Sequence, residues 1–234
     1  MTPSEIRERI ENAKVKANRI NDKIIFTAVS KNHSVDEMKP FEKFVDAFGE
    51  NRVQEAMNKK NIYGACKIQW RLIGHLQHNK INKALEIFDT IDSVDSVKLA
   101  EKLNEHSAAL NRITPVLIEV NTSGEEAKTG IDPKNLNELL DCMAGLKNLR
   151  LDGMMTVGPL TDDEIKIRNS FAQLRTLNEN ARERTGLELP ILSMGMSDDF
   201  ELAILEGSTM TRIGTLLFGP RDYGLGKKVN NLSL

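Results

Sequence analysis

Two groups of residues have the types and positions needed to hold an anionic cofactor covalently, and Lys31 is the first of them. It directly follows the mostly apolar, β-branched run of residues 24–30. At the end of a buried strand, shielding from water lowers the pKa of a lysine and leaves a neutral amine that can form a Schiff base. A single lysine among 32 basic residues is most often a solvated loop residue, so position alone does not assign it.

The second group consists of two short segments, residues 193–197 and 211–215. Gly195 and Gly214 remove side chains, so that backbone N–H groups can approach a ligand closely, and Ser197 stands at a predicted helix start. Barrels of parallel strands often bind phosphate with the loops after their last two strands. Ordinary helix capping and turn formation explain the same residues, and the following Asp198 and Asp199 must turn away from a bound dianion.

A lysine on one side of a barrel mouth and a phosphate cradle on the other are what a pyridoxal phosphate site requires. Arg212 lies in the predicted last strand, so we expect it to project beside the cradle. An always-protonated guanidinium only donates hydrogen bonds, so a pyridine nitrogen facing it stays unprotonated and the ring is a weak electron sink. Such a site would hold the cofactor and support little carbanion chemistry.

An alternation of buried strands and amphipathic helices has to position these residues. The expected strands are residues 24–30, 47–49, 70–74, 90–94, 116–120, 151–155, 191–194 and 210–213. The expected helices include residues 4–19, 34–44, 96–110, 133–145, 162–184 and 198–205. About eight parallel βα units favour an α/β fold of the (β/α)8 TIM barrel type over an open doubly wound sheet. No linker divides the chain, so residues 1–234 are expected to form a single domain that opens with the helix at about 4–19.

Composition excludes several other classes of protein. The chain has 32 Lys and Arg against 34 Asp and Glu, a net charge of −2, which argues against binding to nucleic acid or a membrane surface. No apolar run approaches the roughly 18 residues of a membrane span, and the N-terminus has no signal-peptide core. Cys66 and Cys142 lie far apart, which suggests no disulfide framework and no metal site. We expect a cytoplasmic protein.

Several motifs between about residues 23 and 223 resemble the YggS/PROSC family of pyridoxal phosphate homeostasis proteins. The motifs are Ala-Val-Ser-Lys at 28–31, Gly-Glu-Asn-Arg-Val-Gln-Glu at 49–55, Leu-Ile-Gly-His-Leu-Gln at 72–77, Leu-Ser-Met-Gly-Met-Ser at 192–197 and Arg-Ile-Gly at 212–214. The resemblance implies a barrel similar to the alanine racemase N-terminal domain.

The resemblance also implies roles for individual residues. Lys31 would carry pyridoxal 5'-phosphate as a Schiff base, and Arg212 would face the pyridine nitrogen. Ser197 and the backbone at Gly214 and Thr215 would hold the phosphate. Residues at motif positions near the ring are Asn51 and Met194, and His75 is either a wall of the pocket or a capping or loop histidine.

The sequence departs from the family pattern at four positions. It has Arg71 where histidine is common, Asp92 where histidine or glutamine is common, Glu119 where glutamine is common, and Pro220 in the segment Phe-Gly-Pro-Arg-Asp-Tyr at 218–223. We expect these changes to affect the outer rim and any partner surface, and to leave the covalent and phosphate anchors intact.

Three functions remain open at this point: a carrier that buffers pyridoxal phosphate without turnover, a pyridoxal-phosphate-dependent amino-acid racemase, and a barrel enzyme acting on a phosphorylated metabolite. Racemisation with two bases needs a second acid/base group, which alanine racemases take from a separate C-terminal domain. The only phenols here are Tyr63 and Tyr223, and neither is an evident second base. We therefore expect a carrier rather than an enzyme, working as a monomer, with pyridoxal-phosphate-dependent apoenzymes as recipients.

Overall fold

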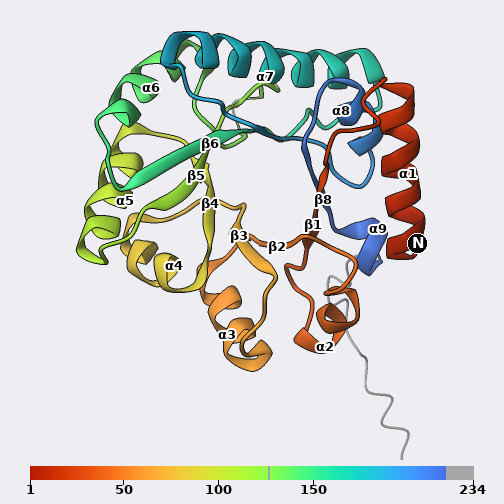
Figure 1. The fold of residues 1–234 in the computed structure, drawn as a ribbon, viewed down its shortest axis with the longest axis horizontal. Coiled ribbons are helices and arrows are strands. Elements are labelled where there is room, and N and C mark those ends of the chain that lie inside the picture. Colours follow the sequence, from red (N-terminus) through yellow and green to blue (C-terminus); the bar gives the residue numbers. More distant parts are fainter. Residues whose placement is uncertain (126, 220–234) are drawn as a thin grey trace, which may run out of the picture.

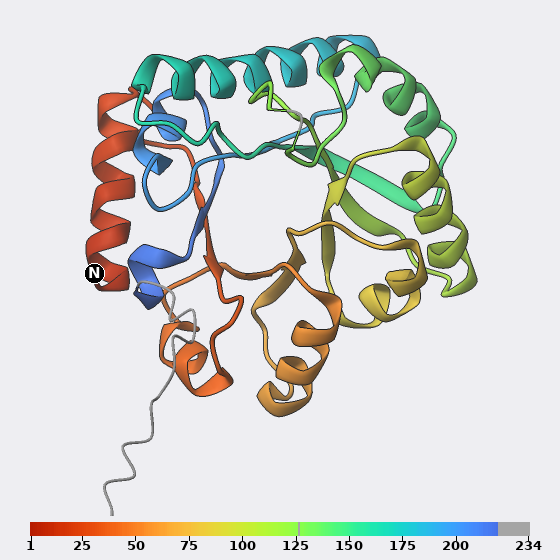
Figure 2. The ribbon, with the colours of Figure 1, turned by 180° about the vertical axis from the view of Figure 1, so that it is seen from behind.

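The computed structural model describes residues 1–125 and 127–219, in which eight parallel strands close into a barrel surrounded by helices (Figure 1 and Figure 2). The strands are β1 (Ile25–Val29), β2 (Ala47–Glu50), β3 (Gln69–Leu72), β4 (Thr90–Val94), β5 (Thr114–Glu119), β6 (Leu149–Met155), β7 (Ile191–Ser193) and β8 (Met210–Ile213). Each overlaps a strand expected from the sequence. The (β/α)8 barrel is thus confirmed. The strands could be predicted because continuous apolar runs are typical of parallel strands that are buried on both faces.

Helices follow the strands around the outside of the barrel. They are α1 (Pro3–Lys16), α2 (Val35–Met38), α3 (Val53–Tyr63), α4 (Ile81–Ile87), α5 (Val97–Ala109), α6 (Leu136–Ala144), α7 (Glu164–Thr185), α8 (Phe200–Leu205) and α9 (Thr215–Phe218), with 3-10 turns η1 (Lys39–Phe41), η2 (His78–Lys80) and η3 (Pro133–Asn135). The single helix expected over residues 34–44 is wrong. Pro40 has no N–H to donate to the carbonyl four residues before it, and its ring crowds that carbonyl, so α2 ends at Met38 and a 3-10 turn follows.

The N-terminal helix α1 starts at a capping box. The Thr2 hydroxyl accepts from the Glu5 N–H while the Glu5 carboxylate accepts from the Thr2 N–H, and Pro3 fills the first helical position. The buried face of α1 lies beside α8 (Figure 1), where Arg9 pairs with Glu201 at 2.7 Å. This helix thereby covers the outside of the barrel next to β8.

Pairing of the first and last strands closes the barrel. β1 pairs with β2 through Thr27 and Ala47, and with β8 through Ala28 and Ile213. Side chains from opposite walls meet in the interior in a small apolar cluster separate from the main core; its members are Leu117, Met155 and Met210, with Ile25, Ile73 and Ile191 packed against them. Because successive side chains on a strand alternate between faces, Glu119 and Arg212, two residues beyond Leu117 and Met210, also point inward.

Three further observations concern the part of the chain that is described, residues 1–125 and 127–219. None of its helices is both long and apolar enough to cross a membrane. The described side chains include no group of three or more potential metal ligands. Cys66 and Cys142 are both free thiols.

Gly153 is a position where the barrel wall requires glycine. Its φ is +149°, and a Cβ built there would lie 1.9 Å from the carbonyl oxygen of Ile191 on the paired strand. We expect Gly153→Ala to lower the free energy of unfolding by about 3 kcal/mol through strain and overpacking. Chemical denaturation measures this. Gly145→Ala is the matched control, because its φ is negative and its nearest neighbour would be an ordinary 3.5 Å away; equal losses in both variants would contradict the explanation.

Candidate functional site

A hollow of about 150 Å³ lies at the carboxyl ends of β1, β7 and β8. It brings together five of the eight residues that the sequence predicted for the site: Lys31, Ser197, Arg212, Gly214 and Thr215. The other lining residues are Val29, His33, Met196, Asp198 and Gly219. An amine, two hydroxyls and a guanidinium thus converge on one cavity at the end of the barrel where such folds bind their ligands.

The remaining three predicted residues do not line this hollow. Met194 is fully buried in the main apolar core. Asn51 follows β2 and is half-buried, with its side-chain oxygen buried and without a hydrogen-bond partner in the described residues. His75 has a side chain that is 54% exposed, and its Nδ1 lies 3.2 Å from Oδ2 of Asp95.

Ser197 joins the two segments of the predicted cradle. Its hydroxyl oxygen accepts from the Leu216 N–H at 3.2 Å, so it caps the first turn of α9 rather than the helix that follows it in sequence. The hydroxyl hydrogen remains available to donate to a ligand. Gly195 serves packing rather than ligand access: its φ is +94°, and a Cβ there would lie 2.6 Å from Cβ of Ala203 on α8.

The Asp198 and Asp199 carboxylates lie differently. Asp199 is buried and turns back to its own loop, where it accepts from the Met196 N–H at 2.6 Å, and burial raises its pKa. Asp198 is exposed at the rim of the hollow, where water and salt screen its charge. Asp199 turns away from the hollow as expected, whereas Asp198 is one of the residues that line it.

Arg212 places a buried positive charge at the hollow. Its guanidinium donates to the Ser193 hydroxyl at 2.6 Å and to the Thr156 carbonyl at 2.7 Å. Within the described residues no carboxylate lies within ion-pair distance of it. Burial lowers the pKa of Arg212, and the charges of Glu119, Asp199 and Asp92 oppose that shift. An arginine guanidinium is protonated throughout the pH range in which proteins fold, so this group carries a charge.

Three of the four departures from the family pattern lie inside the barrel, so their expected place on the outer rim is wrong. Arg71 and Asp92 form a buried ion pair at 2.7 Å, and Thr90 donates to the same carboxylate at 2.9 Å. Glu119 is 3% exposed and accepts from the Thr129 hydroxyl. These three side chains lie on the inner face of their strands, and the apolar pattern of the strands does not show which face is the inner one. Pro220 lies outside the described residues.

The loop that carries Lys31 is held on both sides of this residue. The Ser30 hydroxyl donates to Oε1 of Glu50 at 2.7 Å, and the Asn32 N–H donates to Oε1 of Glu55. Lys59 bridges both carboxylates and also donates to the Ser30 carbonyl. Lys31 itself is partly buried and makes contacts within the protein.

His33 lines the hollow and was not predicted from the sequence. Its ring stacks on Phe218 of α9, with 4.4 Å between centroids and 17° between planes, and its Nδ1 lies 3.1 Å from Oε1 of Glu37. The stack ties the Lys31 loop to α9. In the sequence, only the Lys-x-His spacing after the first strand could have indicated that His33 lies in the hollow, and this pattern is weakly specific.

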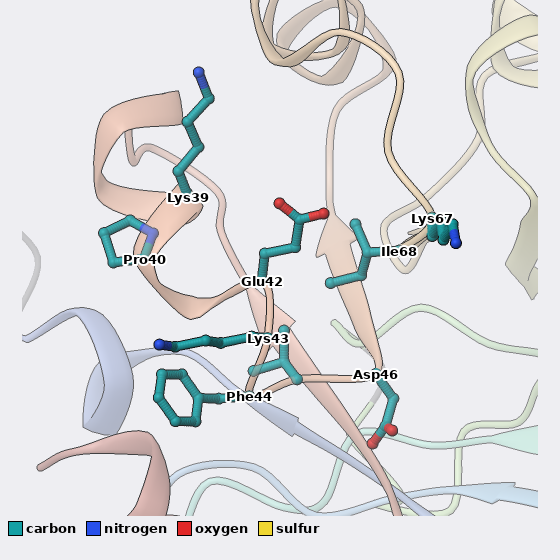
Figure 3. Close-up of a pocket in the computed structure, with 9 residues that line it drawn as sticks. Lys39, Pro40, Glu42, Lys43, Phe44, Asp46, Lys67 and Ile68 are labelled. Carbon is teal, nitrogen blue, oxygen red and sulfur yellow. The ribbon is translucent and has the colours of Figure 1, made fainter.

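A larger hollow of about 840 Å³ lies at the opposite end of the barrel, before β2 and β3 (Figure 3). Its carboxylates have structural partners: Glu42 accepts from the Tyr63 hydroxyl at 2.9 Å, and Asp46 pairs with Arg7 at 2.9 Å. Lys43 lies along the Phe44 ring, as Figure 3 shows. These contacts join loops to the barrel, so the smaller hollow remains the candidate site.

Comparisons with known proteins agree with this geometry. The family model of the alanine racemase N-terminal domain matches residues 3–222. A pyridoxal phosphate homeostasis protein of Aquifex aeolicus is 38% identical over 221 residues, which are 94% of this chain and 97% of that protein. PipY of Synechococcus elongatus, solved with pyridoxal phosphate bound, is 36% identical, with a TM-score of 0.79 over 90% of this chain and 100% of that chain.

An alanine racemase of Clostridium difficile shares the fold alone, at 18% identity and a TM-score of 0.74 over 94% of this chain and 60% of that chain. The chain belongs to the alanine racemase N-terminal domain family and, within that family, to the pyridoxal phosphate homeostasis proteins. The family resemblance seen in the sequence is confirmed.

The buried carboxyl of Glu119 makes stability depend on pH. Burial raises its pKa above the usual 4.5, so its ionisation is less favourable in the folded than in the unfolded state. Stability from this group is therefore present below pH 4.5 and is lost as pH rises through the raised pKa. We expect Glu119→Gln to raise the melting temperature at pH 8 and to change it little at pH 4.

Thermal unfolding at the two pH values measures this difference. Glu125→Gln is the control. The hydrogen bond from Lys128 lowers the pKa of the exposed Glu125 carboxyl, so replacing this carboxylate by a neutral amide should not raise the melting temperature. A melting temperature of Glu119→Gln below that of the unchanged protein at pH 8 would refute the assignment.

Proposed function

We propose that this protein binds pyridoxal 5'-phosphate at the hollow between β1 and β8, holds it through Lys31, and buffers or carries it in the cell. The observation that carries the proposal is the convergence of Lys31, Ser197, Thr215 and buried Arg212 on one cavity. The name of the Aquifex relative and the pyridoxal phosphate bound to PipY support the same function.

The residues present fit this cofactor. A fully buried guanidinium with no carboxylate at ion-pair distance among the described residues favours an anionic ligand, because buried charges need compensation. The polar side chains of Lys31, Ser197 and Thr215 add an amine and two hydroxyl donors. Pyridoxal phosphate offers matching groups: a phosphate, an aldehyde and a ring nitrogen.

Each residue has a separate task in the proposed site. Lys31 would supply the primary amine that holds the cofactor reversibly through its aldehyde, with release of water. Ser197 donates its hydroxyl to the phosphate, and the backbone at Gly214 and Thr215 approaches it closely. Arg212, fixed by Ser193 and Thr156, donates to the ring nitrogen and keeps it unprotonated.

The proposal includes binding without turnover of an amino acid. An arginine partner for the ring nitrogen weakens the ring as an electron sink. Tyr63 cannot serve as a second base, because its hydroxyl donates to Glu42 at the opposite end of the barrel. Tyr223 lies outside the described residues. Pyridoxal-phosphate-dependent apoenzymes as recipients, a monomeric state and a cytoplasmic location stay predictions.

Attachment to Lys31 can be tested by reducing the protein with borohydride after adding pyridoxal phosphate. We expect peptide mass spectrometry to find the reduced cofactor on Lys31, and Lys31→Ala to lose more than about 90% of the visible absorbance band, because no other amine lines the hollow among the described residues. Lys43→Ala, at the opposite end of the barrel, is the control and should keep the band. An undiminished band in Lys31→Ala would show that the cofactor attaches elsewhere.

The absence of turnover can be tested with amino acids. We expect the loaded protein to racemise L-alanine and L-serine no faster than free pyridoxal phosphate at the same concentration, because the site places a weak electron sink before a single base. Chiral chromatography over several hours measures the D-isomers. Sustained formation of D-alanine above the free-cofactor control, abolished in Lys31→Ala, would establish the racemase instead.

A further inference from the structure

Lys59 on α3 has an unusual set of partners for a lysine outside the site. Its side chain is 9% exposed, and its ammonium donates to the Ser30 carbonyl at 2.6 Å and to Oε1 of both Glu50 and Glu55 at 2.7 Å. An ammonium has three N–H donors, so every donor is used. Two of the three acceptors also hold the loop that carries Lys31.

The contacts reach the backbone on each side of Lys31. Before it, Ser30 is fixed through its carbonyl to Lys59 and through its hydroxyl to Glu50. After it, the Asn32 N–H donates to Glu55. We propose that Lys59 is a positioning residue, whose ammonium clamps Ser30, Glu50 and Glu55 together and thereby fixes the direction in which Lys31 enters the hollow.

The loop needs such a clamp because its own conformation is unfavourable. Asn32 has a φ of +66°, in the left-handed region, which asparagine adopts more readily than other residues with a Cβ but which is still less favourable than the right-handed region. The hydrogen bond from its N–H to Glu55 offsets this cost only while the carboxylate stays in place. Contacts from residues outside the loop therefore determine whether the loop keeps this conformation.

The clamp depends on Lys59 rather than on the carboxylates alone. Glu50 and Glu55 lie on the same ammonium, and without it two negative charges would share a mostly buried site. Glu50 is fully buried, burial raises its pKa, and the Lys59 charge acts in the opposite direction. Removal of one member of a buried charge cluster leaves its partners uncompensated, so the cluster would open or take up protons.

This inference rests on the proposed function, since it concerns the placement of the amine that would hold the cofactor. It assigns Lys59 no contact with the cofactor itself. Its effect should therefore appear in the protein before pyridoxal phosphate is added, as greater mobility of the loop, and afterwards as weaker capture.

The experiment compares Lys59→Met with Lys60→Met in the full chain. Lys60 is the next residue on α3 and also has a partly buried amine, which donates to the Ile87 carbonyl and lies 5.7 Å from the Trp70 ring centre, away from the Lys31 loop. Hydrogen–deuterium exchange at the amides of residues 31–33 is measured without cofactor. The dissociation constant for pyridoxal phosphate and the pH profile of its visible absorbance are measured after loading.

We expect Lys59→Met to speed exchange at Asn32 and to weaken binding, each by about tenfold or more, as for the loss of a charge-assisted hydrogen bond. The pH profile of the absorbance should shift as well. Lys60→Met should leave all three unchanged, and Lys59→Arg, which keeps a positive donor, should recover part of each. Should Lys59→Met fail to fold, Glu55→Gln provides the test, with smaller changes in the same direction.

Normal exchange and normal affinity in Lys59→Met would overturn the proposal. Faster amide exchange in Lys59→Met with an unchanged affinity for pyridoxal phosphate would also overturn it. So would an equal loss of affinity in Lys60→Met. Either result would make Lys59 a purely structural residue. Failure of the proposed function is seen separately, as a lack of cofactor on Lys31 in the unchanged protein.

Discussion

Closure of the barrel between β1 and β8 is the constraint on which the candidate site depends. The two strands lie at opposite ends of the sequence, yet Ala28 pairs with Ile213 in the closed sheet. Lys31 leaves the barrel three residues after this pair, and Gly214 one residue after it. The strand pairing therefore sets the lysine and the predicted phosphate cradle side by side, and α9 and the His33–Phe218 stack join the two loops above it.

A second feature is the balance of charge inside the barrel. Arg71 and Asp92 neutralise each other in a buried ion pair, whereas Arg212 and Glu119 are buried near each other without direct contact. Arg212 thus keeps both a fixed orientation, through Ser193 and Thr156, and a charge that a ligand can compensate. Folding removes water from the guanidinium of Arg212, which costs free energy. A bound anionic ligand would offset this cost.

The sequence predicted the strands well because parallel strands buried on both faces consist of apolar, β-branched runs. It predicted Lys31, Ser197, Arg212, Gly214 and Thr215 together because the loops after the first and last strands of such a barrel must meet. The prediction of a single helix over residues 34–44 is wrong because of Pro40. The effect of this proline on the preceding turn outweighs the helical spacing of the apolar residues.

The other misses have a common physical origin. Charged residues in strands are usually exposed, so the sequence gives no sign that Arg71, Asp92 and Glu119 are buried. Only the three-dimensional structure shows that Arg71 and Asp92 neutralise each other inside the barrel. Lys59 and His33 could not be recognised, since their roles come from contacts with residues of other segments. A sequence shows where a lysine follows a strand, but not what holds it there.

The most direct test of the central claim is a crystal structure of the protein with pyridoxal phosphate. We predict continuous density from Nζ of Lys31 to the cofactor, with the phosphate beside Ser197 and Thr215 and the ring nitrogen facing Arg212. A cofactor attached to a different lysine, or a phosphate outside the hollow between β1 and β8, would contradict the account.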